Sequence, residues 1–494
     1  MMRSATPQHR PTCRHSGRHL AALYSAAAGL ALMSGIANGA PVTWSPTGGG
    51  DFNTAGNWNP GTVPTVADDA IFPDNASGNI ALSGAANPLR LSFRKTTGAL
   101  TIDAAGNTMS LGSTTAIPQV ILGTAAGQQN DITLTGGDFT ATHTTGGASV
   151  QVGNFNGSNG NKLTITGAGT NFTSPSTSGT VGAVGIAGSN NNTLSIENNA
   201  NMVFRGSMAV GVIGATPSSG NLLNVNTATF SLTGGSRGLN LRSGTFTMTR
   251  GYSDLGFLDA DDANNSSTIN FNSGTMYSRR TQIDNTRDFV IGDGGADSAI
   301  YGFAYSGGTL TLGAAGRPAD LVINSNGVLT GAGTGTLTGG GIVRGITGAK
   351  VMPSIIGQPV LASDDRDIGT MNFTADWDNS NIEMVLDAGD FPAAAAAMTP
   401  FTPLDVVNIT GAFTHGGVVT FNLVNYVEPD TAGEFKVVGW TSEAGDRSLT
   451  SIQFVGGSPL PTRFDTDGLY ITVPEPTGLL AIAGVPLLVR RRRS

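Results

Sequence analysis

The carboxylates of three short acidic runs are the side chains of this sequence that could act in catalysis. They are Asp68-Asp69, Asp259-x-Asp261-Asp262 and Asp364-Asp365-x-Asp367. Two carboxylates at a set separation hydrolyse glycosidic bonds, and a carboxylate with Ca²⁺ and a basic clamp cleaves acidic polysaccharides by elimination. The second chemistry needs clustered Lys and Arg, whereas the chain has four lysines. We therefore predict solvated loop acids and no catalytic residue; the alternative is a polysaccharide lyase or hydrolase.

Two acidic stretches resemble parts of calcium-binding loops. The run from Asp259 to Asn264 begins like a calcium loop but lacks its glycine at position six and its glutamate at position twelve. The run from Gly292 to Asp297, GDGGAD, resembles one nonapeptide calcium repeat, but such repeats work in tandem copies. We predict no metal site and no cofactor, and Ca²⁺ is the one ion that these patterns leave open.

Histidine and cysteine offer little further chemistry. His143 in ATHTTGG and His415 in FTHGGVV are the histidines that follow residue 39, and neither has a local partner signature. We predict that both are exposed turn residues. Cys13 is the only cysteine and lies in a segment that we expect to be removed, so the exported part would have no disulfide and no thiolate site.

The elements that would position these residues recur along the chain. Val152-Gly153, Val181-Gly182 and Val210-Gly211 follow one another at intervals of 29 residues. Each interval also holds an asparagine-led strand and a phenylalanine, at Asn161, Asn192 and Asn221 and at Phe172, Phe204 and Phe230. Three strands per interval make one turn of a three-sided β-helix, whose turns bury their apolar faces only by stacking. We predict an all-β fold, a right-handed parallel β-helix over residues 76–345. A β-sandwich is the rival, but its hairpin signals would recur every 8–12 residues.

The three asparagines have two interpretations. Stacking would place Asn161, Asn192 and Asn221 above one another, where their amides form a ladder of hydrogen bonds at one corner. The alternative is that they bind sugar. We favour the ladder, because the regular period explains it without a ligand.

The two ends of the repeat region differ from it. Residues 40–75 contain Trp44 and Trp58, which we expect to form an aromatic cap over the first turn; an aromatic sugar platform is the alternative. Over residues 346–472 the period is lost and the strands lengthen, which predicts a C-terminal β-sandwich-like domain. Residues 393–398 lie between two prolines and predict one helix.

The N-terminal 39 residues have the features of a secretory signal peptide. Arg3, Arg10, Arg14 and Arg18 precede an Ala/Leu-rich stretch and a small-residue cleavage site, which predicts export by the general secretory route. Eight of the 26 basic residues and none of the 34 acidic ones lie in residues 1–39 and 477–494. The exported body therefore holds 18 basic and 34 acidic residues, a net charge of −16. An acidic body argues against nucleic-acid binding.

The C-terminal residues 473–494 contain three parts in a fixed order. Pro474, Glu475 and Pro476 precede an apolar run of twelve residues from Gly478 to Val489, too short for a stable span. A basic tail follows, formed by Arg490, Arg491, Arg492 and Arg493, which the positive-inside bias holds on the cytoplasmic side. This order resembles the PEP-CTERM sorting signal, and the segment around Trp44 and Trp58 is similar to the start of planctomycete and verrucomicrobial surface proteins. The resemblance implies an exosortase, a membrane cysteine protease, as partner, with transient membrane anchoring.

These observations predict an exported, non-catalytic structural protein of the cell surface or extracellular matrix. An exopolysaccharide is the other partner that the acidic, exported body suggests. The alternatives are a carbohydrate-active β-helix enzyme and a glycan-binding adhesin.

Overall fold

The computed structural model describes a molecule built almost entirely of β-strands. The described residues are 40–113, 118–143, 148–176, 180–186, 188–211, 218–233, 237–260, 266–303, 308–314, 317–331, 333–353, 369–387, 405–423 and 433–473. The chain divides into two compact units, residues 1–38 and 39–494, and the described residues belong to the second. Within them the helical elements are the 3₁₀ turns η1 (Ala55–Asn57) and η3 (Arg447–Leu449). No helix in this part of the chain has the length and apolarity to cross a membrane.

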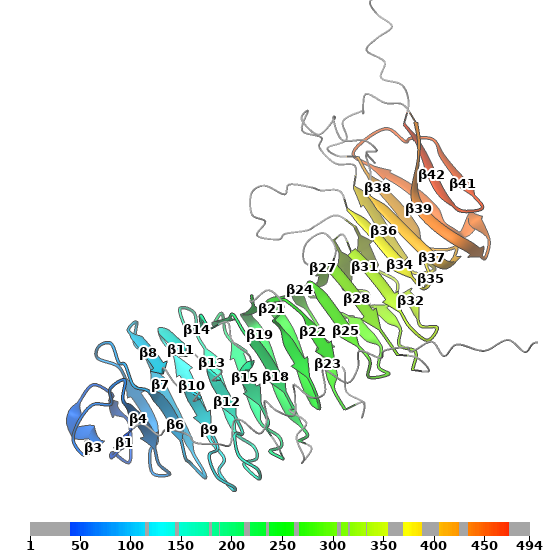
Figure 1. The fold of residues 1–494 in the computed structure, drawn as a ribbon. Helices are drawn as coiled ribbons and strands as arrows, with labels where there is room; N and C mark the ends of the chain where they lie inside the picture. The colour runs from blue at the N-terminus through cyan, green and yellow to red at the C-terminus, as the bar shows by residue number, and fades with distance from the viewer. Residues whose placement is uncertain are drawn as a thin grey trace, which may run out of the picture. The chain divides into compact units, whose positions relative to one another are not determined.

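The strands pair in parallel in three stacks that the chain visits in turn (Figure 1). Stack 1 contains β2 (Gly50–Asp51), β5 (Gly78–Ala81), β7 (Ala99–Asp103), β10 (Asp131–Thr135), β13 (Lys162–Thr166), β16 (Thr193–Glu197), the first halves of β19 (Asn221–Leu232) and β21 (Gly244–Leu255), β23 (Thr268–Phe271), β26 (Phe289–Ile291), β29 (Leu321–Ile323), β32 (Ile342–Gly345), β35 (Asp376–Asp378), and the ends of β37 (Val406–Thr414) and β39 (Gly433–Ala444).

The second and third stacks complete each turn. Stack 2 contains β8 (Thr108–Ser113), β11 (Asp138–His143), β14 (Asn171–Ser174), β17 (Asn201–Phe204), the second halves of β19 and β21, β24 (Gly274–Ser278), β27 (Ala299–Phe303), β30 (Gly327–Thr330), β33 (Ala349–Met352), β36 (Ile382–Asp387), β38 (Val418–Asn422) and β40 (Ser451–Val455). Stack 3 contains β1 (Ala40–Trp44), β4 (Asp68–Phe72), β6 (Arg90–Phe93), β9 (Val120–Leu122), β12 (Val150–Val152), β15 (Thr180–Val184), β18 (Ser207–Val210), β20 (Leu239–Leu241), β22 (Leu258–Ala260), β25 (Arg280–Ile283), β28 (Gly308–Leu312), β31 (Gly333–Leu337), β34 (Thr370–Thr374) and the first halves of β37 and β39.

This arrangement confirms the predicted all-β parallel β-helix. From β6 onwards each turn of the chain contributes a strand segment to each stack, and equivalent apolar side chains lie above one another in the interior. One such buried row in stack 1 contains Leu134, Ile165, Ile196, Val225, Met248, Phe271, Ile291 and Ile323. A single turn has no second layer against which to bury its face, so the stacking itself stabilises the fold.

The register of the repeats differs from the predicted one at two positions. In the structure Val152 pairs with Val184, and Val184 pairs with Val210, so the predicted Val181-Gly182 is displaced by three residues. The pairing of β15 with β18 also has an irregularity between Thr180 and Gly182. In stack 2 Phe172 pairs with a methionine, Met202, because Phe204 lies two residues further along the strand. The number of residues in each turn therefore varies around the predicted 29.

The predicted asparagine ladder is present and is one member longer. Nδ2 of Asn130 donates to Oδ1 of Asn161 at 2.7 Å, Nδ2 of Asn161 donates to Asn192 at 2.9 Å, and Nδ2 of Asn192 donates to Asn221 at 3.1 Å. The same oxygens also accept backbone N–H groups of the preceding member. All four side chains are buried. They satisfy the backbone at a corner of the solenoid and present no surface to a sugar.

The N-terminal tryptophans belong to the core. Trp44 and Trp58 are 1% and 2% exposed, and their rings meet edge to face at 5.0 Å. Phe52 and Phe72 pack against Trp58, and Phe72 stacks on Phe93 of β6. The short strand β3 (Trp58–Asn59) pairs antiparallel with β1 at this end. A sugar platform needs an exposed ring face, so these two tryptophans do not provide one.

The C-terminal part continues the same stacks. We expected a β-sandwich-like domain over residues 346–472, but β34, β35 and β36 stack in parallel on β31, β32 and β33. Among the described strands of this part, the last ones change direction: β42 (Gly468–Val473) pairs antiparallel with β39, and β41 (Thr462–Asp465) pairs antiparallel with β42. The helix predicted at residues 393–398 lies outside the described residues.

Candidate functional site

Some of the acidic residues in the predicted carboxylate clusters have contacts within the fold, and the others lie outside the described residues. Asp69 is buried and forms an ion pair with Arg90, while Asp68 accepts hydrogen bonds from the backbone and hydroxyl of Thr65 at 2.9 and 2.6 Å. Burial raises the pKa of Asp69, and the Arg90 guanidinium opposes that shift. Asp259 lies in β22, in register with Asn240 and Gln282. Asp261, Asp262, Asp364, Asp365 and Asp367 lie outside the described residues.

The second calcium-like stretch is also engaged within the fold. Asp293 accepts from the backbone of Gly295 and from Nδ2 of Asn326, and Asp297 pairs with Arg250 at 2.7 Å. Across the described residues, no three His, Cys, Asp or Glu side chains gather where they could hold a metal ion. The predicted absence of catalytic and metal-binding residues stays a prediction.

The prediction that the two histidines are exposed turn residues is wrong. His143 ends strand β11 and is 4% exposed, because its neighbours in stack 2 cover it. Neither of its ring nitrogens has a hydrogen-bond partner within the described fold, and burial lowers its pKa. His415, 2% exposed, lies among the rings of Phe413, Trp440 and Phe464.

The groups around His415 are arranged in the order of a catalytic triad: a hydroxyl, an imidazole and a carboxylate. Nδ1 lies 3.1 Å from the hydroxyl of Thr450, and Nε2 lies 3.0 Å from a carboxylate oxygen of Glu443. Because the carboxylate can only accept, Nε2 carries the proton. The Thr450 hydroxyl also accepts the backbone N–H of Gly416, and Arg447 pairs with Glu443. Thr450 and His415 are buried, whereas the side chains of Glu443 and Arg447 are partly exposed.

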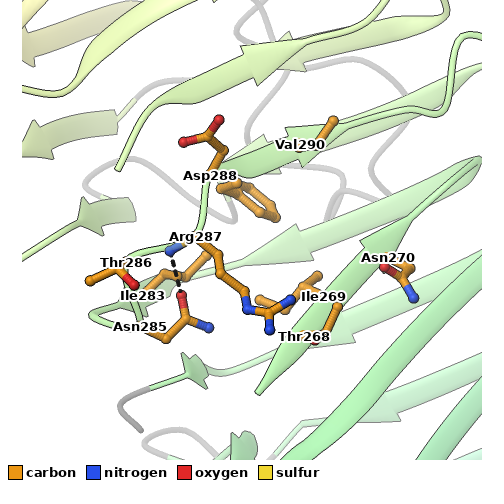
Figure 2. Close-up of a pocket in the computed structure, with 10 residues that line it drawn as sticks. Thr268, Ile269, Asn270, Ile283, Asn285, Thr286, Arg287, Asp288 and Val290 are labelled. Atoms are coloured by element: carbon orange, nitrogen blue, oxygen red, sulfur yellow. Dashed lines mark hydrogen bonds between the residues drawn. The ribbon is translucent and has the colours of Figure 1, made fainter. Parts of the chain in front are cut away.

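A pocket of about 410 Å³ opens at one corner of the solenoid between β23 and β26 (Figure 2). It is lined by ten residues: Thr268, Ile269, Asn270, Ile283, Asn285, Thr286, Arg287, Asp288, Phe289 and Val290. This volume is within the range of small-ligand sites. We refer to it below as the β23 pocket.

The pocket lies where β23 is paired along its length on one side only. β23 pairs with β21 over four residues, Thr268–Phe271, but with β26 it pairs only through Phe271 and Ile291. Phe289 and Val290 of β26 stand opposite Ile269 and Asn270 without pairing with them, and these residues line the pocket.

Side chains of different character line the pocket. Ile283 and Phe289 are buried and form an apolar floor with the half-buried Ile269. Asn285 is held in place because its Nδ2 donates to the carbonyl and hydroxyl of Ser267, while its oxygen accepts the backbone N–H of Arg287. Figure 2 shows the Arg287 side chain extending across the pocket towards Thr268 and Ile269.

The charges around the pocket are unequal. Asp288 points away from the other lining side chains and pairs with Arg344 at 3.1 Å, which in turn pairs with Asp320 at 3.0 Å. Arg287 is exposed, and it is the cationic residue among the ten described residues that line the pocket. Sequence reasoning missed this site, and no motif marks it, because it results from a local loss of strand pairing between β23 and β26.

The predicted sorting residues, Pro474 to Pro476 and Arg490 to Arg493, lie outside the described residues. Comparisons of the chain with protein-family models, with curated proteins and with solved structures found no match.

Proposed function

We propose that this chain is an exported structural protein of the cell surface or extracellular matrix, delivered there by processing at both ends. The single observation that carries the proposal is the order of parts in residues 473–494. A Pro-Glu-Pro triplet, twelve apolar residues and four arginines follow one another, as they do in sorting signals of this kind. The partner that this order implies is an exosortase-like membrane protease.

The pairing of β1 and β42 is consistent with this proposal. β1 pairs with β3 and β4, and β42 pairs with β39 and β41. All these strands lie within residues 40–473, so cleavage after Gly39 and near the Pro-Glu-Pro triplet would leave these pairings intact.

The surface of the solenoid supports a matrix role without catalysis. The row of stack 1 that alternates with the core row carries hydroxyl and amide side chains at Thr133, Thr164, Ser195, Asn224 and Thr247. Thr164 and Ser195 are buried, and the other three are half-buried. Neighbouring strands in a sheet lie about 4.8 Å apart, so these groups repeat at that spacing along the solenoid. With the net charge of −16, such a surface stays hydrated and soluble in a polysaccharide matrix.

The test is to express the full-length chain in a Gram-negative host with and without an exosortase-like protease. We expect intact mass spectrometry to find a C-terminus near Pro474–Pro476 only when the protease is present. Replacing Pro474, Glu475 and Pro476 together by alanine should leave the full tail attached. Thr477→Ala, next to the triplet, is the matched control and should be processed like the wild type.

Two results would overturn the proposal. One is identical processing of the triple variant and the wild type, which would mean that the triplet is not recognised. The other is recovery of the unprocessed chain from the cytosol of cells that contain the protease. Both are independent of any ligand that the body binds.

A further inference from the structure

We propose that the chain cleaves its own backbone between Leu449 and Thr450, with the Thr450 hydroxyl as nucleophile and His415 as general base. The substrate is the peptide bond that precedes Thr450, and water is the co-reactant. This inference goes beyond the proposed surface function, because it concerns a reaction within the body and not the delivery of the chain. Its test uses purified protein without an exosortase, so it can fail while the sorting proposal stands.

The first argument is the contact between a hydroxyl and a base. Thr450 Oγ lies 3.1 Å from Nδ1 of His415, and Nε2 of His415 lies 3.0 Å from a carboxylate oxygen of Glu443. Since Nε2 carries the proton, Nδ1 is an acceptor for the Thr450 hydroxyl. The backbone N–H of Gly416 donates to Thr450 Oγ, which leaves the hydroxyl proton for Nδ1. A hydroxyl held against an unprotonated imidazole is an activated nucleophile.

Glu443 is the positioning residue for this base. Nε of Arg447 donates to both carboxylate oxygens of Glu443, at 3.2 and 3.0 Å. Arg447 itself is held because it also donates to the carbonyls of Phe464 and Asp465. The Arg447 hydrogen bond lowers the pKa of Glu443, so this carboxyl group is ionised at neutral pH and keeps the imidazole proton of His415 on Nε2.

The second argument concerns which substrate a buried hydroxyl can reach. Thr450 is 7% exposed, so its hydroxyl is closed to an external substrate. The carbonyl carbon of the preceding residue is different, because a threonine Oγ that attacks it closes a five-membered ring. Leu449 is 62% exposed, so its acyl group is open to water. The bond between Leu449 and Thr450 therefore lies where a buried nucleophile and the solvent meet.

The third argument is that the backbone on both sides of this bond is fixed. Leu449 is the last residue of the 3₁₀ turn η3. The N–H of Thr450 donates to the Arg447 carbonyl at 3.1 Å, and the N–H of Ser451 donates to the Gly417 carbonyl at 3.1 Å. Groups that are already held in place lose less entropy when they react, which lowers the barrier.

The steps of the reaction balance with water alone. Nδ1 of His415 takes the hydroxyl proton as Thr450 Oγ bonds to the carbonyl carbon of Leu449. The C–N bond between the two residues then breaks, and His415 returns the proton to the leaving nitrogen of Thr450. The product is an ester between Leu449 and Thr450 Oγ, with a free amine on Thr450. Water hydrolyses the ester, which forms a carboxylate at Leu449 and restores the hydroxyl.

The two fragments would stay together after cleavage. β40 follows the cleaved bond and pairs with β38 through five residues, and β42 pairs with β39 through six. These pairings do not depend on the bond between Leu449 and Thr450. The assay is therefore mass spectrometry under denaturing conditions, which separates the fragments.

The test incubates the purified full chain at neutral pH with protease inhibitors. We expect a fragment that ends at Leu449 and one that begins at Thr450, formed at a rate independent of protein concentration. Hydroxylamine should speed cleavage and leave a hydroxamate at Leu449, which is the signature of an ester. Thr450→Val should stop cleavage, Thr450→Ser should retain it, and His415→Gln should slow it at least about a hundredfold.

The matched control is Ser448→Ala, which removes an exposed hydroxyl from the same turn and should be cleaved like the wild type. Glu443→Gln should slow cleavage and Glu443→Asp should restore part of the rate, which a purely structural role of Glu443 does not predict. Circular dichroism is measured on every variant. The two Thr450 variants decide the test even where His415→Gln does not fold.

Three outcomes would contradict the inference. The first is a wild-type chain that stays intact both with and without hydroxylamine. The second is equal cleavage of the wild type and Thr450→Val, which would assign the cut to a contaminating protease. The third is cleavage at a bond other than that between Leu449 and Thr450.

Discussion

Replacing Asn161 by alanine should destabilise the solenoid by several kcal/mol. Oδ1 of Asn161 accepts from the backbone N–H and Nδ2 of Asn130, at 3.0 and 2.7 Å. Its Nδ2 donates to Ser158 and to Oδ1 of Asn192. Alanine would leave both donors of Asn130 without this acceptor. A buried polar group without a partner costs about 1–3 kcal/mol, so the two together predict a loss of about 2–6 kcal/mol.

The assay is denaturant unfolding of the mature chain followed by far-ultraviolet circular dichroism. Tryptophan fluorescence is less suitable, because the four tryptophans, Trp44, Trp58, Trp377 and Trp440, all lie in turns remote from Asn161. The matched control is Asn156→Ala, the same substitution at an exposed turn position, for which we expect a change within about 0.5 kcal/mol. Equal stability of the two variants would refute the ladder as a source of stability.

Three further predictions follow from buried or constrained groups. Burial lowers the pKa of His143 below its usual 6.5, so the stability it contributes is full above pH 6.5 and is lost progressively as the pH falls from there through the lowered pKa of the folded protein. His143→Phe should flatten the pH dependence of the denaturation midpoint between pH 7 and 5. Gly153→Ala should lower stability far more than Gly127→Ala, because both have a φ near +75° but only a Cβ at Gly153 would collide with the ladder. Arg90→Met should cost about 3–5 kcal/mol by leaving the Asp69 carboxylate buried and unpaired, and Asp69→Leu in the same chain should recover most of that loss in thermal unfolding.

The stacked architecture could be predicted from the sequence because its signal is repeated. Each asparagine-led strand of the repeat alternates apolar and polar residues, and the spacing places one strand in each stack per turn. The ladder could be predicted for the same reason, since Asn161, Asn192 and Asn221 occupy equivalent places. Asn130 extends it in the structure. Repetition compensates for the weakness of any single strand signal.

The local register could not be predicted in the same way. Val181-Gly182 and Val184-Gly185 are three residues apart and have the same residue types, so the sequence alone does not say which pair stacks on Val152-Gly153. The structure selects Gly185, whose φ of +74° matches the +74° of Gly153 and the +69° of Gly211. The glycine is needed at that corner because the backbone is left-handed there, and this requirement appears only once the turns are stacked.

The burial of the two histidines could not be predicted from the sequence either. The sequences around His143 and His415 contain threonine and glycine, which favour turns, yet both side chains are buried because strands from other turns pack over them. For His415 the partners Glu443 and Thr450 come 28 and 35 residues later. In a solenoid, burial depends on residues one full turn away, so a local window of sequence cannot distinguish an exposed loop from a position under the next turn.

The β23 pocket arises from the same dependence on distant turns. Ile269 and Asn270 belong to a strand that looks like every other strand of stack 1, and Arg287 follows an ordinary polar turn. What makes the pocket is that β23 pairs with β26 only through Phe271 and Ile291, so a strand that is paired along its length on one side is open on the other. Whether a residue of β23 is paired depends on the strand of the next turn, which lies 20 residues further along the chain. A local window of sequence therefore does not predict the pocket.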